Sequence, residues 1–219
     1  MLGPRIREIS RPGDLPGPCR SCVFWEAPSG RPGPTPGGEA GKEAWWRAAE
    51  LEWGPPGKGV YLDDELAGYV LYGPPEHFPR IRASGRTASD DALLLATLWV
   101  AEDHRGGGLG KTLLQVAMRE AARRNLRAVE ALAVRDDDPP AWRCTTPAGF
   151  LEAHGFAVFQ DDARHPLLRL DLRQTVRWQE QVGHALESVV SALSRRERLP
   201  KPAPDTGLAR TGMAKPERP

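Results

Sequence analysis

The stretch LWVAEDHRGGGLGKTLL, residues 98–114, joins an apolar run to a helical pattern through a cluster of glycines. The run over residues 93–100 has the length and composition of a buried strand. Apolar residues then recur at helical spacing over residues 106–126. A glycine-rich turn between a strand and a helix is a typical phosphate site, because free N–H groups and the positive end of the helix dipole meet there. The stretch therefore predicts a loop that binds phosphate.

Three phosphate-binding patterns compete for this loop. The nucleotide P-loop, G-x-x-x-x-G-K-[ST], fits at residues 110–112, but Arg105 stands where its first glycine is required. The dinucleotide fingerprint G-x-G-x-x-G fails from either starting glycine, because its third glycine position holds another residue. The pattern R/Q-x-x-G-x-G/A is matched in full by Arg105, Gly108 and Gly110. The strand before it and the helix after it are the context that this pattern requires.

With these residues in place, the chain resembles the GNAT family of acetyl-CoA-dependent N-acetyltransferases. Val100 stands five residues before Arg105, as in the family's strand-to-loop motif, and FLEAHGF at 150–156 resembles its second motif. The segments CRSCVFWE and RLDLRQTVRW also resemble an actinobacterial-type subgroup of the family. The resemblance covers about residues 5–172. It implies an α/β (α+β) fold, with a mixed central sheet of about six to seven strands flanked by helices and a splayed pair of parallel strands.

The resemblance also implies acetyl-CoA as co-substrate. The strands over 93–100 and 128–134 are then parallel neighbours, and the pantetheine arm lies in the gap between them. It pairs with backbone groups near Trp99, Val100 and Ala101, while Arg105 adds a positive charge at the pyrophosphate. The other cofactor-binding residues are those whose amides meet the pyrophosphate: Gly106, Gly107, Gly108, Leu109, Gly110, Lys111 and Thr112. The alternative is that the glycines only form a tight turn.

The implied reaction is direct acyl transfer to a primary amine in a ternary complex. The backbone N–H of Val100 is the expected oxyanion donor. The amine must lose a proton to a carboxylate, a histidine or an ordered water. Glu130, within the second parallel strand, is the candidate base, and Asp91 precedes the first. The alternative for Glu130 is a solvent-facing position or an ion pair with an arginine.

The chain departs from the family pattern in its second motif. Leu151 stands where many members have the tyrosine that protonates the leaving thiolate, and Cys144 stands where an asparagine often contacts the pantetheine. Cys144 is either a weak donor near the acetyl group or a small buried cysteine. His104 precedes the pyrophosphate loop and is expected to help position this loop and not to act in catalysis. His154 is expected to cap a helix C-terminus.

The composition of the chain argues against nucleic acid and membrane as partners. The 219 residues carry a net charge of +1, which argues against nucleic acid, and no apolar run is long enough to span a membrane. Neither a secretory signal nor a disulfide framework is expected from the first residues and the three cysteines, so we expect a cytoplasmic protein. Cys19 and Cys22 form a single C-x-x-C, which is half a zinc site, and are interpreted as core-facing residues, with no metal expected.

The rest of the chain predicts one acetyltransferase domain with appendages. The domain covers residues 1–174 and contains a flexible Pro/Gly linker at 27–41; a C-terminal amphipathic helix follows at 175–198 and a disordered tail at 199–219. The C-terminal helix docks either on the domain or on a second subunit, which makes a homodimer possible. Further expected elements are a strand at 5–10, a helix capped by Asp14, a helix at 42–53, a hairpin at 60–72 and a polar loop at 74–91.

Two other functions compete with acetyl transfer. One is a non-catalytic acyl-CoA-binding or sensor module on the same fold, and the other is a P-loop nucleotide enzyme, which Arg105 argues against. The acceptor is open among a small amine, an amino acid, an antibiotic and a protein lysine.

Overall fold

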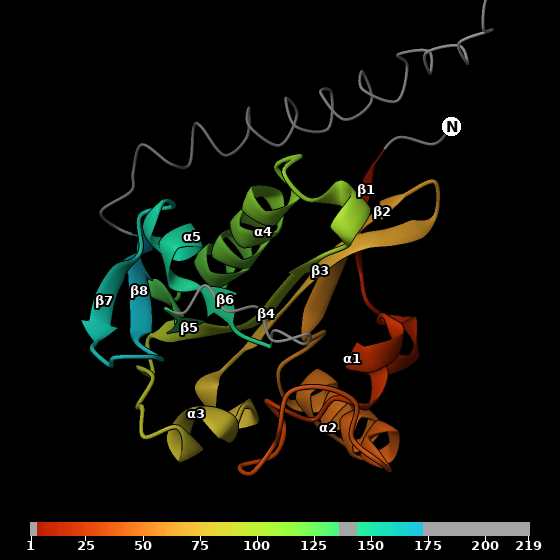
Figure 1. The fold of residues 1–219 in the computed structure, drawn as a ribbon, viewed down its shortest axis with the longest axis horizontal. Helices are drawn as coiled ribbons and strands as arrows, with labels where there is room; N and C mark the ends of the chain where they lie inside the picture. The colour runs from red at the N-terminus through yellow and green to blue at the C-terminus, as the bar shows by residue number, and fades with distance from the viewer. Residues whose placement is uncertain (1–3, 136–143, 173–219) are drawn as a thin grey trace, which may run out of the picture.

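The computed structural model describes residues 4–135 and 144–172, which form one mixed sheet flanked by helices (Figure 1). The helix and the tail predicted at 175–198 and 199–219 lie outside these residues. The sheet has eight strands in the order β1-β2-β3-β4-β5-β8-β7, with β6 paired to β5, where about six to seven were predicted. The strands are β1 (Arg5–Glu8), β2 (Gly57–Leu62), β3 (Glu65–Gly73), β4 (Ala92–Val100), β5 (Ala128–Val134), β6 (Thr146–Pro147), β7 (Ala157–Gln160) and β8 (Leu167–Asp171).

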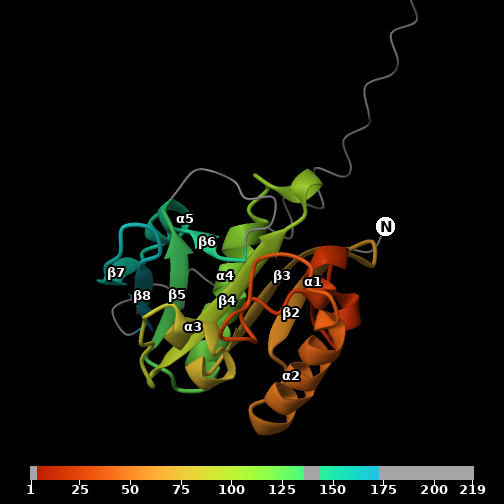
Figure 2. The same ribbon diagram turned by 60° about the horizontal axis from the view of Figure 1, so that its bottom comes forward.

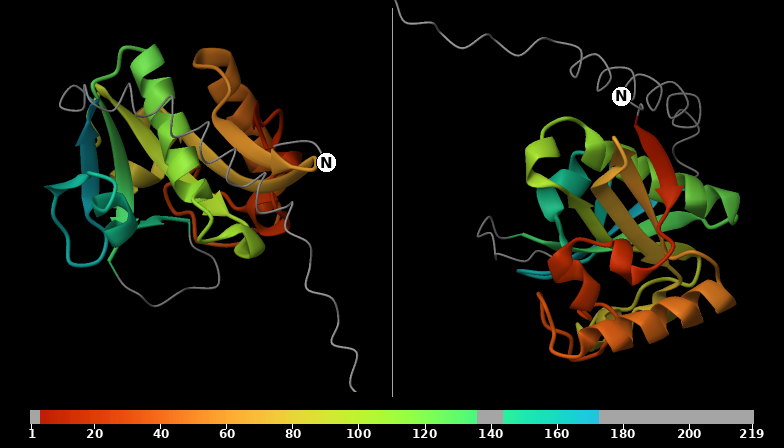
Figure 3. Two further views of the ribbon diagram at one scale, coloured as in Figure 1. Left: turned by 90° about the horizontal axis from the view of Figure 1, so that it is seen from above. Right: turned by 90° about the vertical axis from the view of Figure 1, so that its right-hand side faces the viewer.

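Helices cover both faces of the sheet. The long α4 and the short α5 lie on one face, and α1, α2 and α3 lie on the other, as the views in Figures 1, 2 and 3 show. The α-helices are α1 (Gly17–Ser21), α2 (Gly38–Glu52), α3 (Arg80–Ala83), α4 (Leu109–Arg123) and α5 (Ala148–Glu152). No helix of the described residues is both long and apolar enough to cross a membrane.

The core is divided between these two layers. One cluster fills the space between the sheet and α4, and includes Leu93, Leu95 and Leu113. Two further clusters lie under α1–α3 and include Trp25 and Trp46. Because β4 is covered on both faces, its first half is a continuous apolar run, which is why the sequence predicts it so clearly.

β4 carries one residue more than β3 in the middle of their pairing. Tyr72 lies opposite Leu95, whereas Leu71 lies opposite Thr97, so Ala96 is extra on β4. A bulge of this kind bends a strand and reverses the alternation of its side chains. The reversal is visible here, because Leu95 and Leu98, three positions apart, both contact the cluster under α4. The sequence analysis did not predict this bulge.

The parallel pair β4–β5 opens at the same place. Ala92 pairs with Ala128 and Leu94 pairs with Glu130, and the register ends there although both strands continue. Beyond this point β5 pairs instead with β6, at Ala133 and Val134. The predicted splay of two parallel strands is therefore confirmed.

The N-terminal helices differ from their predictions. Asp14 is not a helix cap: it lies in a 3-10 turn (Pro12–Asp14), and α1 begins after Pro16 and ends before Cys22. The prolines of this segment remove backbone donors, so only a short helix forms. The helix predicted at 42–53 begins four residues earlier, at Gly38, inside the range expected to be a linker.

The glycines of that range are packed against the domain. Gly30 and Gly38 are buried, and a Cβ at Gly38 would lie 2.0 Å from the carbonyl oxygen of Ser21. Thr35 N also donates to Ser21 O at 3.3 Å. Part of the segment predicted as a flexible linker at 27–41 is therefore packed against the domain, since a glycine has no side chain and lets the backbone approach α1 closely.

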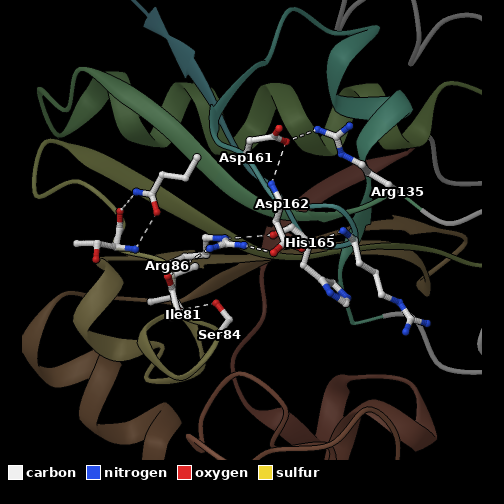
Figure 4. A network of polar contacts seen from close by, with 11 residues as sticks. Ile81, Ser84, Arg86, Arg135, Asp161, Asp162 and His165 are labelled. Carbon is white, nitrogen blue, oxygen red and sulfur yellow. Dashed lines mark hydrogen bonds and ion pairs between the residues drawn. The ribbon is translucent and has the colours of Figure 1, made fainter.

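The segment predicted as a polar loop at 74–91 contains α3 and is bonded to the other end of the sheet. Arg86 forms an ion pair with Asp162, and the side chain of Gln160 exchanges hydrogen bonds with the backbone of Thr87 at 2.5 and 3.2 Å. Figure 4 shows Arg86 reaching the β7–β8 connection, where Asp161 also pairs with Arg135 at 2.7 Å. These polar contacts, together with the buried side chains of Phe78 and Ile81, hold the segment against the sheet.

A buried ion pair fixes α2 to the chain that follows α1. The Nζ atom of Lys42 lies 2.6 Å from Oε1 of Glu26, and the two side chains are 5% and 3% exposed. Lys42 Nζ also donates to the backbone oxygen of Cys22 at 2.8 Å. The cost of burying each of these charges is offset only while the oppositely charged partner is present.

Replacing Glu26 with glutamine should therefore destabilise the protein, because the buried ammonium loses its counter-charge. We expect Glu26→Gln to lower the free energy of unfolding in urea by about 3–5 kcal/mol. The matched control is Glu43→Gln, which removes the carboxylate of the exposed Arg47–Glu43 pair at 3.9 Å and should cost less than about 0.5 kcal/mol. Equal effects of the two substitutions would contradict the role given to the buried pair.

Candidate active site

A cleft of about 1310 Å³ opens where β4 and β5 diverge. Its lining comes from both faces of the sheet, so the cleft connects the α4 side with the α1 side. The α4-side lining includes Arg105, Gly106, Gly108, Leu109, Gly110, Lys111, Phe150 and His154; the α1-side lining includes Pro16, Pro18, Cys19, Cys22, Gly33 and Trp99. Cys144 and Thr145, just before β6, also line it.

The end of β4 presents its backbone to the gap. Leu98, Trp99 and Val100 are half-buried and line the cleft, unlike the fully buried first half of the strand. Ala101 N donates to Ala67 O of the neighbouring strand β3 at 2.9 Å. Successive residues of a strand bond to opposite neighbours, so the N–H of Val100 points away from β3 and toward the gap.

The turn into α4 leaves amide groups directed at the cleft. Gly106 and Gly108 have φ of 72° and 86°, a conformation that favours glycine, and Gly108 is the N-cap of α4. No side chain caps the helix, and its first backbone bond runs from Thr112 N to Gly108 O at 3.1 Å. The amides between these two residues are therefore available to an anion.

The charged and polar residues of this loop divide into two groups. Lys111 lines the cleft, and Arg105 lines it with its Nε donating to Val100 O at 3.1 Å, which holds the guanidinium beside the loop. The Thr112 hydroxyl donates to Gly108 O at 3.3 Å and is buried in the helix. Ala101, Gly107 and Thr112, which the resemblance assigned to the cofactor, are not among the lining residues.

The helix α5 packs on the first turn of α4. A Cβ at Gly110 would lie 3.3 Å from the Phe150 ring, so a larger residue there would crowd this ring. The His154 ring lies 4.4 Å from that of Phe150, and its Nδ1 donates to Phe150 O at 2.7 Å, as expected for a histidine that caps a helix. Phe150 lines the cleft although the sequence analysis gave it no role of its own.

Glu130 is held in an ion pair. Its side chain is fully buried, accepts hydrogen bonds from Ser89 Oγ at 2.7 Å and Ser89 N at 2.9 Å, and pairs with Arg169 at 2.7 Å. Arg169 also bonds to Asp91 and thereby lowers the pKa of that carboxyl. Glu130 does not line the cleft. This arrangement favours the ion-pair alternative over a catalytic base.

Leu151 belongs to the core. It is fully buried in the cluster under α4, so the position where a tyrosine was sought offers no hydroxyl to the cleft. His104 and His154 are the histidines among the described lining residues.

The three cysteines lie together along the α1 side. Cys22 Sγ lies 3.6 Å from Cys144 Sγ, and Trp25 Nε1 donates to Cys144 O at 2.8 Å. The hydrogen bond with Cys144 lowers the pKa of the Cys22 thiol to about 6 and raises that of Cys144, while burial raises the pKa of Cys19. The described residues hold no group of three or more side chains that could bind a metal ion.

The geometry of the cleft agrees with the protein family whose model matches this sequence. The model of the acetyltransferase (GNAT) family matches residues 23–150. The chain belongs to the GNAT acetyltransferase family. Acetyl-CoA is the co-substrate of this family and hence of this chain, and the cleft suits it: a diverging strand pair, uncapped amides with open space at Gly106, and cationic side chains at one end.

Solved structures share the fold at low identity. An N-acetyltransferase from Staphylococcus aureus Mu50 has a TM-score of 0.50 and 15% identity, over 78% of this chain and 99% of that chain. The NatC complex bound to Gag peptide and CoA has a TM-score of 0.50 and 10% identity, over 78% of this chain and 99% of that chain. The PaiA N-acetyltransferase from Thermoplasma acidophilum, in complex with coenzyme A, gives 0.47 and 16%, also over 78% and 99%. No curated protein matches the chain in sequence.

The pKa values of the cysteines predict that Cys22 becomes reactive at lower pH than Cys19. The thiolate is the reactive form, so alkylation of Cys22 by iodoacetamide should reach its plateau below pH 8, with a midpoint near 6. The rate at Cys19 should still rise roughly tenfold per pH unit there, because its pKa is raised. Peptide mass spectrometry after timed alkylation measures both sites in one sample.

The control for this profile is Cys144→Ala, which removes the thiol in contact with Cys22 at 3.6 Å. We expect it to move the Cys22 midpoint upward, toward the ordinary thiol range, while leaving the Cys19 profile unchanged. Burial of Cys22 slows its alkylation at every pH and does not shift the midpoint. The same midpoint for Cys19 and Cys22 in the unmodified protein would refute the assignment.

Proposed function

We propose that the protein is an N-acetyltransferase that transfers the acetyl group of acetyl-CoA to a primary amine by direct attack in a ternary complex. The observation that carries this proposal is the divergence of β4 and β5 beyond Leu94 and Glu130. It joins the two faces of the sheet through one cleft, so that a donor on the α4 side and an acceptor on the α1 side can reach the same point.

The donor half is built for a diphosphate. The amides at the start of α4 and the side chains of Arg105 and Lys111 present positive charge at one end of the cleft. The half-buried end of β4 lies along the gap, where its outward-facing backbone groups can pair with an amide-bearing arm. When bound, acetyl-CoA supplies an activated acyl carbon at the far end of that arm.

Val100 is proposed as the oxyanion donor. The next residue, Ala101, donates its N–H to Ala67 O on β3. Because successive N–H groups of a strand point to opposite sides, the N–H of Val100 faces the gap. A backbone amide held by a paired strand is already oriented, so it stabilises developing negative charge without reorganisation. The bulge at Ala96 sets which β4 amides face the gap.

Apart from the Cys22 thiol, whose pKa is lowered, the acceptor half carries no charged side chain among its described lining residues. Its lining is formed by Pro16, Pro18, Cys19, Cys22 and Trp99, whereas the acidic and basic lining residues lie at 102–111 and at His154, just after α5. A carboxylate on the acceptor would therefore lie in this half without a counter-charge, which is unfavourable. We propose an acceptor whose amine is attached to an apolar body.

A matched pair of amines tests this preference. Phenethylamine and phenylalanine differ by one carboxylate, and we expect kcat/KM for phenethylamine to be at least roughly tenfold higher, corresponding to about 1.4 kcal/mol of transition-state binding. Because the cleft cysteines are expected to react with thiol reagents, CoA and the N-acetyl product should be quantified by chromatography and mass spectrometry. Faster acetylation of phenylalanine would contradict the apolar acceptor half.

A second function, acyl-CoA binding without transfer, is favoured by one observation, the buried Leu151 at the tyrosine position. The two functions make opposite predictions in the same assay. Acetyl-CoA binding by calorimetry together with product from any amine supports transfer. Binding without product across neutral and charged amines supports the non-catalytic module and would overturn the proposal.

The donor site is tested by Gly108→Glu. The substitution puts a negative side chain at the N-cap of α4, where φ is 86°, and we expect the Kd for CoA to rise at least roughly a hundredfold, or about 2.7 kcal/mol. The matched control is Gly108→Asn, since asparagine tolerates the left-handed conformation and adds no charge; it should lose far less affinity. Unchanged affinity in folded Gly108→Glu would show that the pyrophosphate does not bind at this loop.

A further inference from the structure

Two cysteines from distant parts of the chain meet in the wall of the cleft. Cys22 follows α1 and Cys144 precedes β6, with 122 positions between them, and their sulfur atoms lie 3.6 Å apart. That distance is a non-bonded contact from which a small side-chain movement leads to a covalent S–S bond. No motif in the sequence connects these two residues.

The surroundings of Cys22 suit a thiolate. The backbone N–H groups of Phe24 and Gly33 lie near its sulfur and favour the thiolate, in addition to the contact with Cys144 at 3.6 Å. The ammonium of Lys42, which donates to the Cys22 carbonyl oxygen, adds positive charge nearby. These groups lower the pKa of Cys22, and thiolate character is what makes a cysteine react with disulfides.

Cys144 is placed as the second thiol. The Trp25 indole holds its backbone by donating to Cys144 O at 2.8 Å. Cys22 is buried and Cys144 is partly exposed, and both line the open cleft, which gives a reagent a route to the pair from solvent. Such an arrangement resembles the pairing of an attacking and a resolving cysteine, in which the first forms a mixed disulfide and the second displaces it.

We propose that Cys22 and Cys144 form a thiol–disulfide modification site that low-molecular-weight disulfides oxidise. The Cys22 thiolate attacks one sulfur of the reagent, the reagent's S–S bond breaks, and one thiolate leaves. Cys144 then loses its proton and attacks the Cys22 sulfur, which releases the second thiolate. The two cysteines give up two electrons, and the reagent is reduced to two thiols that take up the two protons.

The resulting cross-link joins the segment after α1 to the strand end at β6. Both segments border the acceptor half, so the bond restrains the two walls between which an acceptor enters. Cys19 provides an internal comparison. It lines the same cleft and lies on α1, but burial raises its pKa. It is therefore not expected to take part.

The experiment uses the full chain without acetyl-CoA, incubated with oxidised glutathione at pH 7.5 and quenched with acid. We expect intact mass spectrometry to show the loss of two hydrogens, and non-reducing peptide mapping to identify a Cys22–Cys144 link that dithiothreitol reverses. Cys144→Ser should stop at the mixed disulfide on Cys22, and Cys22→Ser should form no link. Cys19→Ser is the matched control and should form the link as the unmodified protein does.

Three results would overturn the proposal: no protein disulfide, a link that includes Cys19, or a mixed disulfide on Cys22 that persists in the unmodified protein. Peptide mapping of the unmodified protein decides among them even where a variant fails to fold. A further arm measures acetyl transfer, which the oxidised protein should lose at least fivefold and recover with dithiothreitol. Only this arm rests on the proposed function, so its failure leaves the disulfide result standing.

Discussion

One extra residue in β4 determines how the rest of the site is built. Opposite β3, Ala96 has no counterpart, and the alternation of β4 side chains reverses across it. The strand bends away from β5 at this point, and the β4–β5 register ends at Leu94 and Glu130. A regular strand would pair to its end, and the start of α4 would then face a closed sheet. The cleft therefore depends on a local irregularity of backbone pairing more than on any single side chain.

The elements that the sequence predicts well are those with a complete local signal. The helix α4 has its apolar period, its glycine turn lies directly before it, and β5 was predicted with its observed bounds at 128–134. The donor half of the cleft is contained in this one stretch of chain, so its main residues are readable without knowledge of the fold. The helix nevertheless begins at Leu109 and not at 106, because the left-handed Gly106 and Gly108 belong to the turn.

The features that the sequence did not predict need a partner from elsewhere in the chain. The bulge is defined by the register with β3, and the burial of Gly30 and Gly38 is defined by their approach to the chain around α1. The acceptor half is assembled from α1, Gly33, Trp99 and the residues before β6, and no single motif joins these separate segments. A charged residue such as Glu130 is ambiguous for the same reason, since its role depends on where Arg169 and Ser89 lie.

The two halves of the cleft are supported by different parts of the core. The donor half rests on the cluster between the sheet and α4, whereas the acceptor half rests on the aromatic clusters under α1–α3 and on the buried pair of Lys42 and Glu26. Lys42 bonds directly to the backbone of Cys22, so the same pair that anchors α2 positions the acceptor wall. Separate support allows the acceptor wall to change in sequence while the bulge and the glycine turn stay in place. A short, proline-rich α1 and a glycine-rich approach to α2 are therefore compatible with an intact donor site.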